Sequence, residues 1–163
     1  MKKENSMNRF RNTLLATALL ALVQLTSASA ETTAPIPNPA PDHPELRPVL
    51  DEFGGHEGLK ALMDDFMVIL LDDPRMRPFF EQVDQQRVKD KLAEQFCVIL
   101  GGDCTYTGMD MVEAHAGMEV RHADFNILVE DLQIAMDGRD IPTRAQNKLL
   151  AKLAPMHREV INR

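Results

Sequence analysis

The sequence is short of positive charge, of cysteine and of long hydrophobic runs. Its 163 residues hold 18 lysine and arginine residues against 25 aspartate and glutamate residues, and only two cysteines. The longest apolar run, residues 13–25, is shorter than the roughly 20 residues that a membrane-spanning helix needs. Because an acidic chain is repelled by phosphate groups, we expect no nucleic-acid partner and no docking on an anionic membrane.

The N-terminus has the pattern of a secretory signal. Four basic residues precede the apolar run, and the small residues "ASA" end it at Ala30, as a signal peptidase requires. We therefore predict that residues 1–30 are cleaved and that the protein is exported, to the periplasm. An uncleaved membrane anchor is the alternative, and the lack of cysteine near the cut argues against a lipid anchor. Without residues 1–30 the chain keeps 14 basic and 24 acidic residues.

A proline-rich segment follows the predicted signal. Residues 31–48 contain six prolines, a composition that favours an extended, solvated linker without a core. Residues 49–163 then form one small domain. Nothing in its sequence demands more than a monomer.

The sequence pattern of the domain predicts an all-α fold. Apolar residues recur at helical spacing, and no segment has a convincing strand pattern. The spacing predicts helices over residues 59–71, 84–100 and 122–137, a short helix at His115, and a last helix that begins near Pro142 and is kinked at Pro155.

The two cysteines lie close together in "CVILGGDC". Such an even pair in an exported protein favours a disulfide between Cys97 and Cys104. Two free thiols are the alternative. A metal site has less support, because no further cysteine or histidine lies near with ligand spacing. His43 and His56 show no sign of a role.

His115 is the residue that most needs an explanation. It follows Met111 and Val112 by four and three residues, so the three share a helix face that should point inward. A core histidine with one hydrogen bond is one interpretation. The other is a ligand for haem iron, which binds a neutral imidazole from an apolar wall.

Five strings in order resemble the truncated haemoglobins of group 1 over about residues 49–161. They are "GGHEGLKALMDDF", "PRMRPFF", "LGGDCTYTG", "MVEAHAGM" and "FNILVEDL". The resemblance implies a two-over-two helical sandwich around haem b. It makes His115 the proximal iron ligand and Phe80 the ring that packs on the porphyrin. Further residues expected around the haem are Met67, Val88, Leu92, Phe96, Met111 and Phe125.

The chain departs from that family on the distal side. Met67 stands where group 1 members commonly have a tyrosine, and Val88 and Leu92 occupy two positions that are often polar. Dioxygen on ferrous haem carries partial negative charge, and a distal donor stabilises it by about 1–3 kcal/mol. Tyr106, the only tyrosine, is no obvious replacement. We therefore expect weak oxygen binding. Nitric oxide is a serious rival as the physiological ligand, and the binding of carbon monoxide should depend less on the missing donor.

Other polar residues leave alternatives open. Lys91 could be a sixth iron ligand, as in some family members, or could pair with a haem propionate. Arg87, Lys89 and Arg121 could also meet a propionate. His157 could attach to a haem vinyl group, as a histidine of the last helix does in some members, or could be an exposed helix residue.

Four functions therefore compete. They are binding of a diatomic gas, nitric oxide dioxygenation with an external reductant, electron transfer by a haem held by His115 and Lys91, and a haem-free interaction module. The chain has no flavin or nicotinamide domain, which weakens the enzymatic reading, and the redox partner is unknown.

Overall fold

The structure, a computed structural model, describes residues 38–163. The predicted signal and residues 31–37 of the predicted linker lie outside the described residues. All regular secondary structure in residues 38–163 is helical, without strands, as the sequence predicted. Its elements are η1 (Pro44–Leu46), α1 (Arg47–Glu52), α2 (Gly55–Asp72), α3 (Arg77–Phe80), α4 (Gln85–Ile99), α5 (Met111–Ala114), α6 (His122–Gly138), α7 (Thr143–Leu153), η2 (Ala154–Met156) and α8 (His157–Val160).

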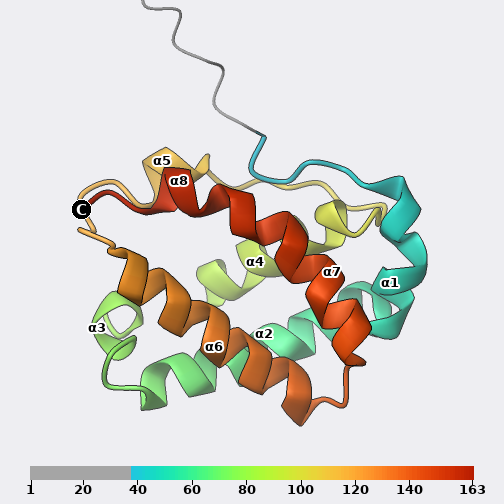
Figure 1. Cartoon of the computed structure of the whole chain (residues 1–163), viewed down its shortest axis with the longest axis horizontal. Helices are drawn as coiled ribbons and strands as arrows, with labels where there is room; N and C mark the ends of the chain where they lie inside the picture. The colour runs from blue at the N-terminus through green and yellow to red at the C-terminus, as the bar shows by residue number, and fades with distance from the viewer. Residues whose placement is uncertain (1–37) are drawn as a thin grey trace, which may run out of the picture. The chain divides into compact units, whose positions relative to one another are not determined.

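Four long helices form two packed layers. Helix α2 packs against α4, and α6 packs against both α2 and α7. Figure 1 shows α6 and α7 crossing in front of α2 and α4, with the short α5 and α8 side by side at one edge. The apolar stripes of these helices meet in one core, whose fully buried side chains include Leu59, Leu62, Met63, Leu70, Ile99, Met136 and Leu149. Among residues 38–163 no helix combines the length and apolarity needed to cross a membrane.

Side-chain caps and prolines set the helix ends. The carboxylate of Asp84 accepts a hydrogen bond from the backbone N–H of Arg87 (3.1 Å) and so caps α4. Asp110 caps α5 in the same way through the N–H of Glu113 (2.8 Å). Helix α7 ends two residues before Pro155, and a 3₁₀ turn follows it, which confirms the predicted kink.

The domain begins earlier than the sequence indicated. We expected residues 31–48 to be a solvated linker, but its described part packs on the helices. Ala40 is buried, and Leu46 belongs to the main core. The amide of Gln95 donates to the carbonyl of Pro39. Apolar side chains spaced among the prolines thus dock this segment, and one proline begins η1.

Candidate functional site

A cavity of about 390 Å³ opens beside α4, α5 and α6, within the size range of cofactor sites. Most of its wall is apolar. The apolar side chains lining it include Phe66, Met76, Phe79, Phe80, Val83, Val88, Leu92, Met109, Met111, Met118, Val120, Phe125, Leu128 and Val160. The polar residues in the wall include His115, Lys91, Gln95, Tyr106, Arg87, Asp84 and Asp124.

His115 lies in the cavity wall, directly after α5. Its Nδ1 lies 2.8 Å from the carbonyl oxygen of Met111. Because a carbonyl can only accept, Nδ1–H must be the donor, and the neutral ring then keeps its lone pair on Nε2. Metal-bound histidines usually have this arrangement, in which the second ring nitrogen donates to a carbonyl and fixes the tautomer.

Asn162 at the C-terminus anchors the segment that carries His115. Its amide nitrogen donates to the backbone carbonyl of His115 (2.6 Å), and its amide oxygen accepts from the N–H of Val120 (2.8 Å). The amide thereby bridges both sides of the turn between α5 and α6. This is a contact between residues 47 apart in the chain, and the sequence pattern gave no sign of it.

Besides His115 and Lys91, seven residues were expected around a haem, and five of them line the cavity. Those that line it are Phe80, Val88, Leu92, Met111 and Phe125. Met67 and Phe96 are buried but are not part of the wall.

The neighbours of Met67 and Phe96 take their places. Phe66 of α2 and Gln95 of α4 line the cavity instead. Helix α2 presents the face one residue earlier, whereas α4 keeps Val88 and Leu92 on the cavity and differs only toward its C-terminal end. Val112 was also expected to point inward but is 47% exposed. A helix as short as α5 does not keep one continuous inner face.

Three of the polar side chains in the wall, Lys91, Tyr106 and Gln95, already direct their hydrogen-bond donors at other protein groups. The ammonium of Lys91 donates to both carboxylate oxygens of Glu94 (2.8 and 3.0 Å) and to the hydroxyl of Thr107. The hydroxyl of Tyr106 donates to the carbonyl of Met109 (2.8 Å), and burial raises the pKa of that phenol. Gln95, which is buried, donates to Pro39.

Glu94 is the centre of the Lys91 network. Burial alone would raise the pKa of this carboxyl, but hydrogen bonds from Lys91 and Thr107 together outweigh burial and lower the pKa. Glu94 therefore stays ionised at neutral pH and holds the ammonium of Lys91 at the edge of the cavity.

The basic residues expected near the rim differ in their partners. Lys89 pairs with Asp64 (2.6 Å), and Arg121 pairs with Asp124 (2.9 Å). Arg87 lines the cavity, and none of the ion pairs found in residues 38–163 includes it. Arg87 is thus the basic side chain best placed to meet an anionic group there.

His157 lies beside the cavity and is not part of its wall. Its ring centroid is 6.2 Å from that of Phe125, and its Nδ1 donates to the carbonyl of Ala154 (2.8 Å).

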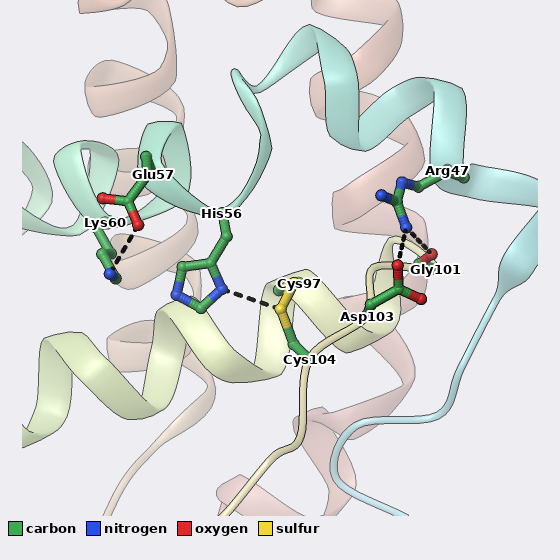
Figure 2. Close-up of a disulfide and its surroundings, with 8 residues drawn as sticks. All are labelled: Arg47, His56, Glu57, Lys60, Cys97, Gly101, Asp103 and Cys104. Carbon is green, nitrogen blue, oxygen red and sulfur yellow. Dashed lines mark hydrogen bonds and ion pairs between the residues drawn. A yellow bond between two sulfur atoms is a disulfide. The ribbon is translucent and has the colours of Figure 1, made fainter.

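Cys97 and Cys104 form the predicted disulfide, with their Cα atoms 6.0 Å apart. Figure 2 shows His56 of α2 pointing at this bond, with its Nδ1 2.9 Å from the Sγ atom of Cys104. No role was expected for His56 from the sequence, because 48 residues separate it from Cys104.

The comparisons with known proteins agree with this architecture. A family model described as "Bacterial-like globin" matches residues 48–162. The chain is a bacterial-like globin of the group 1 truncated haemoglobin type. A group 1 truncated haemoglobin from Mycolicibacterium paratuberculosis is 30% identical over 112 residues, which cover 69% of this chain and 82% of that protein. One from Tetrahymena pyriformis is 30% identical over 84 residues, which cover 52% and 69%.

Solved structures give the same fold. The truncated haemoglobin of Tetrahymena pyriformis in its Fe(III) form superposes with a TM-score of 0.67 at 23% identity, covering 71% of this chain and 98% of that one. The 2/2 haemoglobin of Synechococcus, solved with covalently attached haem, gives 0.65 at 18% identity and the same coverage. The two-over-two helical sandwich predicted from the sequence is therefore confirmed.

Proposed function

We propose that this globin binds haem b through His115 and takes up a diatomic gas on the opposite side of the iron. The observation that carries the proposal is the hydrogen bond made by the ring of His115. Its Nδ1–H is committed to the carbonyl of Met111, which leaves the Nε2 lone pair for a metal, in a mainly apolar cavity. Bound haem would supply a ferrous iron with one open position. Phe80 and Phe125 would pack on the porphyrin, and Arg87 would face a propionate.

The side of the cavity formed by Val88 and Leu92 is apolar, which bears on the choice of gas. Lys91, Gln95 and Tyr106 have their donors engaged elsewhere. Dioxygen would therefore lack the hydrogen bond that is worth about 1–3 kcal/mol. Nitric oxide and carbon monoxide depend less on that bond, so we propose nitric oxide as the stronger candidate and dioxygen as a weakly held ligand.

Electron transfer by a six-coordinate haem is the second candidate, and it requires Lys91 to bind iron. Its ammonium would first have to leave Glu94 and Thr107, so the open five-coordinate site is favoured. Nitric oxide dioxygenation would need an external reductant. Covalent attachment of His157 to haem is a separate prediction, which mass spectrometry of the acid-denatured protein tests.

The first experiment compares haem-loaded wild-type protein with His115→Gly. The wild type should bind one haem per chain and give a five-coordinate, high-spin ferrous spectrum. His115→Gly should lose that spectrum and regain it when imidazole is added. His122→Gly, at an exposed histidine, is the matched control and should behave as the wild type. A His115→Gly spectrum identical to that of the wild type would refute the assignment.

Lys91→Ala separates the two candidate functions. If the gas-binding proposal holds, the spectrum of this variant matches the wild type in both oxidation states. A low-spin wild type that turns high-spin in Lys91→Ala would instead establish lysine ligation. Export to the periplasm is proposed as well, and N-terminal sequencing of the secreted protein should place the cut after Ala30.

A further inference from the structure

Two sulfurs and one imidazole nitrogen meet beside the C-terminal end of α4, at a place that is not part of the haem cavity. Cys97 lies in the last turn of α4 and is only 1% exposed, while Cys104 in the following loop and His56 in the first turn of α2 are half-buried. One donor atom from each residue lies within 4.8 Å of the other two. Figure 2 shows the three side chains converging from three separate segments.

The disulfide does not explain why His56 lies there. A disulfide sulfur carries no hydrogen, so Nδ1–H of His56 donates to Sγ of Cys104, which is a weak acceptor. Within residues 38–163 the side chain of His56 makes no other hydrogen bond. The charged groups nearby are paired without it: Arg47 with Asp103, and Lys60 with Glu57.

We propose that this cluster is a zinc site that opens when the disulfide is reduced. An external dithiol breaks the bond between the two Sγ atoms and is itself oxidised to a disulfide, while Cys97 and Cys104 each gain a proton. Zn²⁺ then binds both sulfurs as thiolates, and the two thiol protons pass to solvent. The imidazole binds as a neutral ligand through Nδ1, with its proton moved to Nε2.

The three donors are spaced for this cation. Zinc bonds of about 2.3 Å to sulfur and 2.0–2.1 Å to nitrogen, in tetrahedral geometry, place the sulfurs roughly 3.8 Å apart and each roughly 3.6 Å from the nitrogen. The present donors already lie within 4.8 Å of each other. Reduction therefore has only to separate the two sulfurs by a small movement of Cys104, since Cys97 is fixed by its helix.

Gly102 allows the loop to lie against the helix that carries Cys97. A Cβ atom at this position would lie 2.5 Å from Sγ of Cys97 and 2.7 Å from Cδ2 of Leu50. Any side chain here would push the loop, and Cys104 with it, away from Cys97. The glycine thus keeps the cysteine sulfurs together whether or not they are bonded.

The donor set also selects the cation. Two thiolates and one imidazole are soft ligands that suit zinc and disfavour magnesium or calcium. Two negative thiolates offset the charge of Zn²⁺, so the filled site is neutral beside the buried Cys97. Because Cys104 and His56 are partly exposed, water can take the fourth position.

The test compares two samples of the full haem-loaded protein. In one the disulfide is intact, and in the other a phosphine has reduced the disulfide and has then been removed under exclusion of oxygen. Both samples are dialysed against zinc, and the metal is counted by mass spectrometry. The reduced protein should bind one zinc per chain and the oxidised protein none. Zinc-edge X-ray absorption should show two sulfur ligands and at least one nitrogen.

His56→Gln is the informative variant, because it leaves both cysteines in place. Even outer-shell partners of metal ligands are worth 10–100-fold in affinity, so loss of this ligand should weaken zinc binding at least about tenfold. His122→Gln is the matched control and should bind zinc as the wild type does. Equal zinc uptake by oxidised and reduced wild type, or a zinc environment without sulfur, would overturn the proposal. Both of these outcomes come from the wild type, so they do not depend on how a variant folds.

Discussion

Reduction of the Cys97–Cys104 disulfide should lower the free energy of unfolding by about 2.5 kcal/mol. The two cysteines have a sequence separation of 7, so the bond closes a loop of about eight residues in the unfolded chain. Loop-closure entropy for that length is about 8 cal/mol/K, which is about 2.5 kcal/mol at 25 °C. The loss acts mainly through the unfolded state, because the folded loop is also held by Arg47, which donates to the carbonyl of Gly101 (3.4 Å).

Urea unfolding followed by circular dichroism measures this loss. With an m-value of about 2 kcal/mol per molar, the midpoint should fall by about 1.2 M on reduction. A chelator must be present, because zinc bound to the reduced folded state would raise the midpoint again. The Cys97→Ala/Cys104→Ala double variant should be insensitive to reductant. The reasoning is refuted if the wild-type midpoints coincide while thiol counting shows that one sample is oxidised and the other reduced.

Three further predictions concern single side chains. Asp131 is buried, its Oδ2 finds no hydrogen-bond partner within residues 38–163, and burial raises its pKa, so Asp131→Asn should raise Tm at pH 7 by about 3 °C. Calorimetry at pH 4 should show a smaller gain in Tm. The wild-type carboxylate is destabilising only when it is ionised, so its cost in stability is lost as pH falls through the raised pKa. An equal gain at both pH values would contradict the assignment of the effect to a buried charge. Gly102→Ala should cost about 1–3 kcal/mol in urea unfolding, whereas Gly138→Ala, which meets nothing within 4 Å, should cost nothing. Leu92→Gln should supply a donor to dioxygen and slow its release about tenfold in stopped-flow measurements, with little change for carbon monoxide; unchanged oxygen release would show that Leu92 does not face the gas.

The sequence predicted the helices well because their signals are local. Helix α4 needs only its apolar stripe and the cap at Asp84, which lie within one stretch of chain. The wall of the cavity was less predictable. Phe66 rather than Met67 lines it, because the orientation of a helix about its axis depends on what packs against its other side.

Contacts between distant segments were missed for a different reason. His56 meets Cys104 only because the first turn of α2 lies beside the loop after α4, and no spacing in the sequence encodes that approach. The same holds for Pro39, whose carbonyl accepts from Gln95 across 56 residues. The proline content of residues 31–48 favoured a solvated linker, but burial of Ala40 and Leu46 holds the described part of this segment against the helices.

The chemistry of the cavity depends on which polar atoms are already satisfied. An ammonium has three N–H bonds, and Lys91 directs all three at Glu94 and Thr107. The single O–H of Tyr106 is likewise taken. His115 is the opposite case, because its Nδ1–H is engaged by the carbonyl of Met111 and its Nε2 is left for a metal. The imidazole of His115 can therefore give an electron pair to a metal, whereas Lys91 and Tyr106 have no N–H or O–H left for a bound gas. This asymmetry is the physical basis for the proposals that His115 binds haem iron and that nitric oxide is held better than dioxygen.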